Sequence, residues 1–213
     1  MTATAPRKRG RPPKSVQAFG DTREALIRSG LVLLTQHGFL TTGVDAVVKQ
    51  AGVPKGSFYY YFKSKEEYGI SVLDAYDRFF THMLTKHLEN DLHSPLARLS
   101  HFIADACAGM QKYAFSRGCL VGNLMQECPG LPSTFVAQLD TILGGWQARV
   151  QRCFHEAQCQ GEIAQHADIK RLAAVFWSGW EGAVMRAKLA SSLQPIDDFW
   201  HYFQQLLALP APT

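Results

Sequence analysis

The chain has 213 residues, of which 46% are hydrophobic and 19% are charged, a composition typical of a globular protein with a substantial core. It contains no long uncharged apolar run, so we expect neither a signal peptide nor a membrane span and predict a cytoplasmic protein. Residues 1–65 hold 11 Lys and Arg against 3 Asp and Glu, whereas the remainder holds 11 against 15, which indicates a nucleic-acid-binding segment joined to an acidic body.

Residues 1–19 are rich in proline and basic residues and show no hydrophobic period, so we expect a disordered arm. Within this arm the string RKRGRPPK resembles an AT-hook. Its Arg-Gly-Arg core is narrow enough to enter an A·T-rich minor groove, whose negative potential attracts arginine. Arg9 and Arg11 are therefore predicted DNA contacts, and a merely solubilising basic tail is the alternative.

Residues 42–65 have the pattern of a helix-turn-helix. Apolar residues recur at three- and four-residue spacing after Thr42, which predicts a short helix with this threonine as its N-cap. Gly52 and Pro54 then indicate a turn, because glycine can adopt a positive φ and proline suits the first turn of a helix. A preceding helix, from residue 21 or 22 to about residue 37, is expected to brace the pair.

The second helix of the pair carries Phe58 and Phe62 four residues apart, so both rings are expected to face the core. Its outward face then presents tyrosines beside a lysine, a serine and a glycine. Such a surface suits a close approach to phosphates and base edges. A buried helix pair whose tyrosines pack against another element is the alternative.

The string AGVPKGSFYYYFKSKEE resembles the DNA-binding signature of the tetracycline-repressor (TetR) family, in which a glycine turn, a K-G-[ST]-[FL]-Y core and a Ser-Lys-Glu entry to the next helix occur in this order. The resemblance implies a recognition helix in the major groove, with Lys65 holding a phosphate. The expected DNA contacts in this segment are Thr42, Lys55, Gly56, Ser57, Tyr59, Tyr60, Tyr61 and Lys65.

The resemblance also implies an all-α fold of about nine helices. Residues 20–65 are then the DNA-binding domain, and residues 66–213 a helical ligand-sensing and dimerisation domain. The sequence itself supports helices throughout the second domain, because a capping box at Ser64 and prolines at helix starts punctuate its apolar periodicity. The expected helices span residues 64–88, 95–115, 133–160, 168–190 and 195 onward, with a compact segment at 118–124.

Five cysteines occur, an odd number with no C-x-x-C pair, which argues against a disulfide framework and a structural zinc site. We therefore expect reduced thiols, no metal and no cofactor.

The predicted helix 168–190 has two different faces. One is a stripe of small residues that would let another helix approach closely, and with the aromatic last helix it is a plausible dimer seam. The other combines aromatic rings with a carboxylate and an ammonium group, which suits a small-molecule pocket, although core packing with charges at the rim is the alternative. The small stripe comprises Gly179, Gly182, Ala183 and Ala190, and the second stripe Trp177, Trp180, Glu181, Val184 and Lys188.

The strings RGCLVGNL and WEGAVMRAKL resemble the branch of the TetR family that contains acrylate-responsive and electrophile-sensing repressors. The resemblance implies that Cys119 is a sensing thiol and that Lys188 acts beside it. A nearby ammonium group, or Arg117, would lower the pKa of the thiol and raise the fraction of reactive thiolate. Reversible binding of a carboxylate by Lys188 or Arg186 and covalent capture by Cys119 are both open.

The predicted function is therefore a repressor that binds a near-palindromic operator as a homodimer and is released by an acrylate-like or other reactive small molecule. One alternative is a regulator with a purely non-covalent ligand and a structural Cys119. Two others are a cysteine-dependent enzyme, for which no histidine has a recognisable spacing to Cys119, and an architectural DNA-binding protein that uses only the AT-hook.

Overall fold

The computed structural model describes residues 16–208, with side chains from residue 21 to residue 207. Over this range the chain is all-α, as predicted, with nine α-helices and one short 3-10 turn. The helices are α1 (Val16–His37), α2 (Val44–Ala51), α3 (Lys55–Tyr61), α4 (Lys65–Leu88), α5 (Pro95–Lys112), α6 (Leu120–Glu127), α7 (Ser133–Cys159), α8 (Ile169–Ala190) and α9 (Gln194–Ala208), and the 3-10 turn is η1 (Cys128–Gly130).

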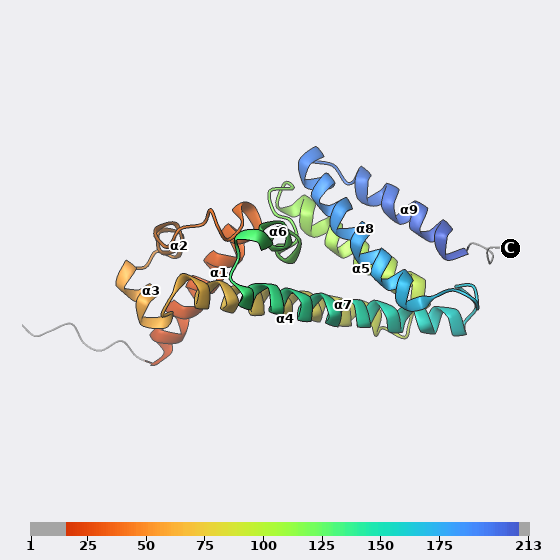
Figure 1. Cartoon of the computed structure of the whole chain (residues 1–213), viewed down its shortest axis with the longest axis horizontal. Coiled ribbons are helices and arrows are strands. Elements are labelled where there is room, and N and C mark those ends of the chain that lie inside the picture. Colours follow the sequence, from red (N-terminus) through yellow and green to blue (C-terminus); the bar gives the residue numbers. More distant parts are fainter. Residues whose placement is uncertain (1–15, 209–213) are drawn as a thin grey trace, which may run out of the picture.

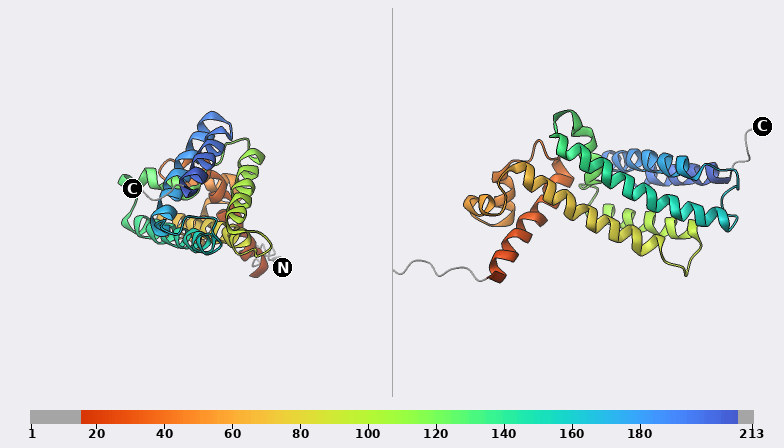
Figure 2. Two further views of the ribbon diagram at one scale, coloured as in Figure 1. Left: turned by 90° about the vertical axis from the view of Figure 1, so that its right-hand side faces the viewer. Right: turned by 60° about the horizontal axis from the view of Figure 1, so that its bottom comes forward.

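The molecule is elongated, with α1, α2 and α3 at one end (Figure 1). Helices α4 and α7 lie side by side along its length, and α8 packs between α7 and α9 (Figure 2). Because α4 begins directly after α3 and contacts α1, α5 and α7, it joins the helix-turn-helix end to the body. A rotation of α4 in the body would therefore also move α3.

Three predicted helix ends differ from the structure. Helix α1 begins at Val16, inside the segment expected to be a disordered arm. Helix α5 ends at Lys112 rather than near residue 115, because Ala114 and Phe115 have positive φ values of 48° and 56° that break the helix. The predicted N-cap of α2 at Thr42 is also wrong. Gly43 occupies that position, and the Thr42 hydroxyl instead donates to the carbonyl oxygen of Gly38 at 2.6 Å.

The start of α4 has the predicted cap. Ser64 Oγ accepts a hydrogen bond from the backbone N–H of Glu67 at 3.0 Å. The Glu67 carboxylate reaches back to the backbone N–H of Lys63 at 2.8 Å, one residue earlier than in the usual reciprocal arrangement. One turn later the Tyr68 hydroxyl donates to the Leu26 carbonyl oxygen at 2.8 Å and fixes α4 against α1.

Aromatic rings form the centre of the body. The Phe80 and Trp146 centroids are 4.2 Å apart, and those of Trp146 and Trp177 are 5.4 Å apart, so one cluster joins α4, α7 and α8. The buried indole N–H of Trp146 donates to Asp77 Oδ1 at 2.8 Å, which satisfies its polar atom inside this apolar layer. These contacts hold α4 and α8 in a fixed relation on either side of a cavity described below.

Candidate nucleic-acid interface and ligand pocket

Helix α3 is anchored by its phenylalanines, as predicted. Phe58 is completely buried and Phe62 is 1% exposed, and both rings pack on Tyr68 of α4 with centroid distances of 5.1 and 5.0 Å. The opposite face is exposed, with Tyr59 56% exposed and Tyr60 69% exposed. Hydroxyl-bearing rings on a short, rigid helix at the end of the molecule are well placed to enter a groove.

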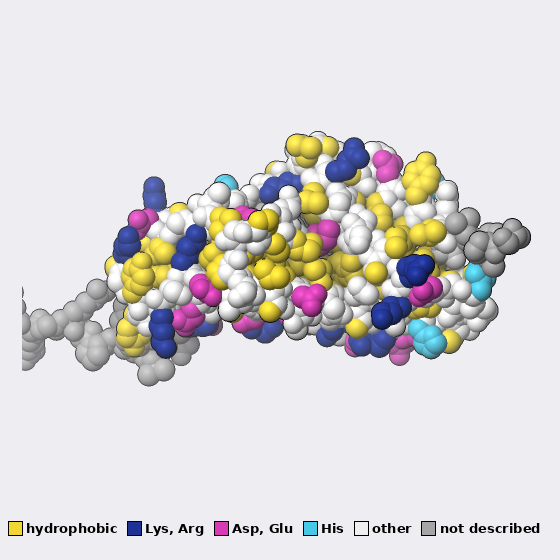
Figure 3. All heavy atoms as spheres, in the orientation of Figure 1, with side chains coloured by type: hydrophobic (Ala, Val, Ile, Leu, Met, Phe, Trp, Pro, Cys, Tyr) yellow, Lys and Arg dark blue, Asp and Glu magenta, His cyan; other side chains and the backbone are white. Residues whose placement is uncertain are grey.

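Two further residues keep the outward face open. Gly56 is exposed, and a Cβ atom there would meet nothing within 4 Å, so the backbone can approach a nucleic acid closely. The Lys55 ammonium group is exposed and lies 2.8 Å from Asp45 Oδ1 on α2, which raises the pKa of the lysine. Both partners of this ion pair are exposed, so the lysine remains accessible from solvent. Several Lys and Arg side chains are visible at this end of the molecule (Figure 3).

The remaining predicted contacts are less accessible. Ser57 and Tyr61 are half-buried, with the Tyr61 ring edge-on to Tyr60. Thr42 is buried and its hydroxyl is already engaged, so in this conformation it is part of the packing and not of the outward face. Lys65 donates to the Leu40 carbonyl oxygen at 3.2 Å, and burial lowers the pKa of its ammonium group. Arg9 and Arg11 lie outside the described residues.

Lys55→Ala is expected to weaken operator binding and relax sequence preference, because a lost base contact costs about 1–3 kcal/mol of discrimination. Tyr59→Phe should weaken binding to all sequences alike, since a phosphate contact sets affinity without reading a base. Fluorescence anisotropy with matched and mismatched duplexes measures both effects. Lys170→Ala, an exposed lysine at the start of α8, is the matched control for charge loss. Unchanged affinity for both α3 variants would refute the assignment of α3 as the reading helix.

The body contains a cavity of about 570 Å³. It is lined by residues of α1, α4, α5, the segment before α6, and α8, and its walls are mostly apolar. Thr35 of α1 forms part of the wall, so the cavity extends to a helix that also packs on α2 and α3. A space of this size suits a small molecule.

Cys119 lies in the wall of this cavity and is 7% exposed. It caps α6, and its Sγ accepts a hydrogen bond from the Gly122 N–H at 3.5 Å. We expected a neighbouring cation to lower the pKa of the thiol, and this expectation is wrong. Burial raises the pKa of Cys119 well above its ordinary value, and the negative charge of Glu181 raises it further. The resting group is therefore a neutral thiol.

Glu181 is the carboxylate beside this thiol. Its side chain is 5% exposed, and neither carboxylate oxygen has a hydrogen-bond partner among the described residues. Burial raises the pKa of Glu181 to about 7. A Cβ atom at Gly122 would overlap Oε2 of Glu181, so glycine is required there for the carboxylate to lie against the start of α6. Tyr76 of α4 completes the group. It lines the cavity together with Cys119, and burial, with smaller effects of Cys119 and Glu181, raises the pKa of its hydroxyl well above its ordinary value.

The predicted tryptophans are buried, and Trp180 lines the cavity whereas Trp177 belongs to the aromatic cluster behind it. Neither indole N–H has a hydrogen-bond partner within the described part of the chain. The two predicted cations of α8 lie elsewhere. Lys188 Nζ donates to the carbonyl oxygens of Thr35 and Gln36 at the end of α1, and Arg186 lines a separate groove. The structure therefore does not bring Lys188 or Arg186 to the cavity wall.

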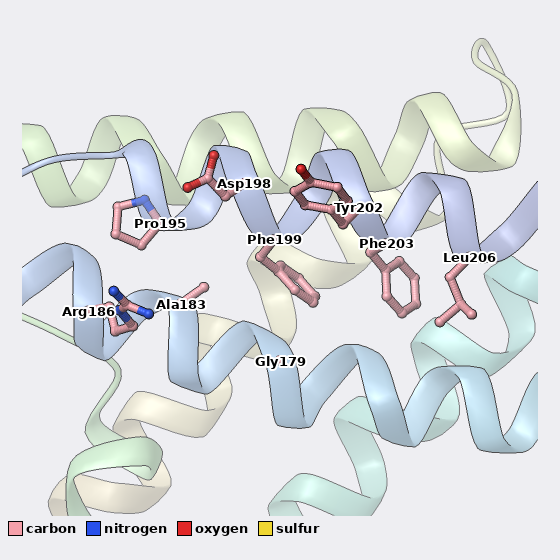
Figure 4. Close-up of a pocket in the computed structure, with 9 residues that line it drawn as sticks. All are labelled: Gly179, Ala183, Arg186, Pro195, Asp198, Phe199, Tyr202, Phe203 and Leu206. Carbon is pink, nitrogen blue, oxygen red and sulfur yellow. The ribbon is translucent and has the colours of Figure 1, made fainter.

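That groove runs between α8 and α9 on the outside of the body and has a volume of about 430 Å³ (Figure 4). The Phe199 ring points toward Gly179, where a Cβ atom would overlap it, so this glycine serves packing within the chain. Gly182 faces open space instead. On both sides of Gly182, α8 exposes apolar side chains: Val175 and Leu189 lie about two helical turns away and Met185 about one, and Leu189 is 88% exposed.

Two family models match the chain. Residues 26–67 match the bacterial regulatory proteins of the tetR family, and residues 95–203 match the tetracyclin repressor-like C-terminal domain. The chain belongs to the TetR family. As a member it is a transcriptional repressor with an N-terminal DNA-binding helix-turn-helix and a helical ligand-binding domain, and it is not an enzyme. The family rules out the cysteine-dependent enzyme considered from the sequence.

Two curated TetR-family relatives are similar over most of the chain. Transcriptional regulator AcuR of Cereibacter sphaeroides is 44% identical over 196 residues, which cover 92% of this chain and 89% of AcuR. The repressor NemR of Escherichia coli K12 is 27% identical over 191 residues, 90% of this chain and 96% of NemR. The crystal structure of regulatory protein TetR from Rhodobacter sphaeroides gives a TM-score of 0.85 at 44% identity, covering 86% of this chain and 97% of that one.

Within this TetR-family body, sequence analysis missed two residues of the cavity. No motif in the sequence singles out Tyr76, and Arg117 was predicted only to lower the pKa of the thiol. The Arg117 guanidinium lies 3.7 Å from the centre of the Tyr113 ring, and its buried Nε has no hydrogen-bond partner among the described residues.

Among the described residues, no helix combines the length and the apolar character that a membrane span requires.

Proposed function

We propose that this TetR-family protein is a cytoplasmic repressor that is released from its operator by a small reactive molecule bound in the α4–α5–α8 cavity. The observation that carries the proposal is the position of Cys119. Its thiol lines the cavity, and α6, the helix that it caps, contacts the end of α1 through the Asn123 side-chain amide and the Thr35 carbonyl oxygen. A molecule that reacts with or presses on Cys119 thus acts on an element in contact with the DNA-binding end.

The proposed effector is a small unsaturated carboxylate or carbonyl compound. Arg117 is the cation that supports this class, because its guanidinium lies in the cavity wall with a buried, unpaired Nε. A carboxylate can accept hydrogen bonds from such a group, and charge-assisted pairs of this kind are strong in a dry site. The resemblance to acrylate-responsive and electrophile-sensing repressors favours the same class. A non-covalent ligand of similar shape, with Cys119 as wall only, is the alternative.

The proposed operator-binding species is a homodimer. The groove between α8 and α9 and the exposed apolar positions of α8 give two helices per chain that can form a four-helix seam with a second copy. Gly182 leaves room for close approach in the middle of that seam. Two recognition helices would then reach successive major grooves about 34 Å apart on a near-palindromic site.

The proposed signal path uses α6 as well as α4. At the start of α6, the Gly118 N–H and the Asn123 side-chain amide both donate to the Thr35 carbonyl oxygen, at 3.4 and 2.9 Å. At its end, Glu127 Oε2 accepts from the backbone N–H groups of Phe39 and Leu40 at 2.9 and 3.0 Å. A shift of α6 or a tilt of α4 would change the separation of the two recognition helices and favour release.

The test is a release titration on a duplex selected from a random pool by the purified protein. Acrylate, an unsaturated aldehyde, a quinone and hypochlorite are added to the wild type and to Cys119→Ser, with propionate as the saturated control. We expect the wild type to sediment as a dimer and to leave DNA with at least one reactive compound but not with propionate. Cys119→Ser should lose that response. Release of Cys119→Ser at wild-type concentrations would favour the non-covalent alternative, and no release of the wild type would refute the effector class.

A further inference from the structure

The pairing of Cys119 and Glu181 is unusual for a buried site. An unpaired buried carboxylate is costly, because both of its oxygens lose water and gain no donor. Glu181 is 5% exposed, and neither oxygen has a donor that meets hydrogen-bond geometry in the described part of the chain. The neighbouring Cys119 thiol only partly offsets the effect of burial on the pKa of this carboxyl group. Structural packing would be served better by an apolar side chain at this position. The carboxylate therefore calls for a chemical role.

We propose that Glu181 is the proton acceptor that activates Cys119 for addition to α,β-unsaturated carbonyl compounds, with Tyr76 donating to the sulfur as the thiolate forms. The inference rests on the proposed function and specifies how its site would react. Three elements supply the three groups: α4 carries Tyr76, the N-cap of α6 is Cys119, and α8 carries Glu181. Gly122 has no side chain, and this leaves room for the Glu181 carboxylate beside the thiol.

The step balances without a further reactant. The S–H bond of Cys119 breaks and its proton passes to a Glu181 oxygen. The sulfur electron pair forms a bond to the β-carbon of the unsaturated compound, and the π electrons of the double bond move onto the α-carbon and carbonyl oxygen. The proton then passes from Glu181 to the α-carbon, which leaves a saturated thioether on Cys119 and an ionised Glu181. Nothing is oxidised or reduced overall by an outside group.

The arrangement explains how a buried thiol can be selective. Burial keeps Cys119 neutral at rest, since its pKa is raised well above the ordinary value, and a neutral thiol is a poor nucleophile. An internal base makes the thiolate only within the cavity, where a compound that fits is already positioned. Compounds too large for the cavity would then meet a protonated, inaccessible sulfur.

Other titratable groups that line the cavity contact partners other than Glu181. Asp105 of α5 is bonded to Lys86 and His87 of α4, at 3.1 and 2.7 Å. The Arg117 guanidinium stacks on Tyr113 at 3.7 Å from the ring centre, and Lys112 Nζ lies 5.7 Å from the same centre. Cys119 and Tyr76 are the titratable groups that interact with Glu181, so these three should determine the pH dependence of the reaction.

The test measures alkylation of single cysteines by acrylamide, a small neutral unsaturated amide, with peptide mapping by mass spectrometry. The exposed Cys159 of the same chain is the internal reference. In the wild type the Cys119 rate should rise with pH and level off above about pH 7, following ionisation of Glu181. Glu181→Gln should slow Cys119 by about 100-fold at neutral pH, the contribution typical of a general base, and leave Cys159 unchanged.

A structural role and a basic role for Glu181 give different results. If Glu181→Gln alkylates Cys119 at the wild-type rate with the wild-type pH profile, the inference is overturned. Tyr76→Phe should slow the reaction less than Glu181→Gln and keep the plateau, because it removes a donor to sulfur but not the base. A rate lost equally in both variants, with the pH profile unchanged, would also count against Glu181 as the base.

The inference and the proposed function can fail separately. Wild-type protein that acrylate releases from DNA without any adduct at Cys119 keeps the proposed function with a non-covalent ligand and overturns the inference. An adduct that depends on Glu181 but never releases DNA supports the inference and refutes the proposed effector response. Should Glu181→Gln unfold, Glu181→Asp retains the carboxylate and moves it away from the thiol, and a wild-type rate in that variant would contradict the need for a precisely placed base.

Discussion

Glu181→Gln is expected to change the pH dependence of stability by about 2–3 kcal/mol between about pH 5 and about pH 8. Burial raises the pKa of Glu181 to about 7 from an ordinary value of 4.5, so the folded wild type holds this proton more tightly than the unfolded chain does. Between these two values the folded state binds more protons, and its free energy of unfolding must fall as pH rises. The glutamine side chain does not titrate, so the free energy of unfolding of this variant should not show this fall.

The direction in which stability changes with pH distinguishes Glu181 from an ordinary ion-paired carboxylate. A carboxylate held by a cation has a lowered pKa, and its contribution to stability is lost as pH falls. Glu181 behaves in the opposite sense, because desolvation is the largest cause of its raised pKa. Its destabilising effect is absent below about pH 4.5 and fully present above about pH 7.

Urea unfolding at equal protein concentration measures this difference. For each protein we take the change in the free energy of unfolding from the lower to the higher pH, and we compare this change between Glu181→Gln and the wild type. The comparison removes any effect of the buried amide that does not depend on pH. Glu24→Gln, at an exposed carboxylate of α1, is the matched control and should show little change. Parallel pH profiles for Glu181→Gln and wild type would mean that Glu181 is solvated or paired in solution.

Local features of the fold could be predicted from the sequence because their causes are local. Pro54, Gly52 and Ser64 fix the turns and caps of the helix-turn-helix through their own backbone preferences. The burial of Phe58 and Phe62 follows from their four-residue spacing alone. The end of α5 could not be predicted in this way. Its apolar pattern continues, and positive φ values at Ala114 and Phe115 depend on the path of the following segment.

The candidate pocket could be predicted only in part, because its chemistry depends on which helices meet. Spacing on α8 grouped Trp180 with Lys188, yet Trp180 lines the cavity whereas the Lys188 side chain reaches the end of α1. Residue spacing predicts on which side of a helix a side chain lies, but it does not predict which neighbouring element packs against each turn. The pKa of Cys119 was predicted in the wrong direction for the same reason. The sequence showed a nearby Arg117 but not the burial and the Glu181 carboxylate that decide the sign.

Glu127→Ala is expected to separate effector capture from DNA release. Glu127 accepts the backbone N–H groups of Phe39 and Leu40, just after α1, while Cys119 caps the other end of the same short helix. Hydrogen bonds to charged acceptors contribute about 1.5–3 kcal/mol each, so loss of this pair should remove at least about 2 kcal/mol of coupling between α6 and the DNA-binding end. Gly38 supports the contact, since a Cβ atom there would overlap the Glu127 carboxylate.

The measurement compares adduct formation at Cys119 with operator release in the same samples. Glu127→Ala should form the adduct at the wild-type rate, because the substitution lies at the far end of α6 from the thiol. Operator affinity after full modification should then remain at least about tenfold tighter than that of the modified wild type, since about 1.4 kcal/mol of lost coupling corresponds to a factor of ten. Glu127→Gln, which keeps an acceptor oxygen, is the control and should release DNA more nearly as the wild type does. If modified Glu127→Ala leaves the operator as readily as the modified wild type, the signal passes through α4 and the contact at the end of α6 is only structural.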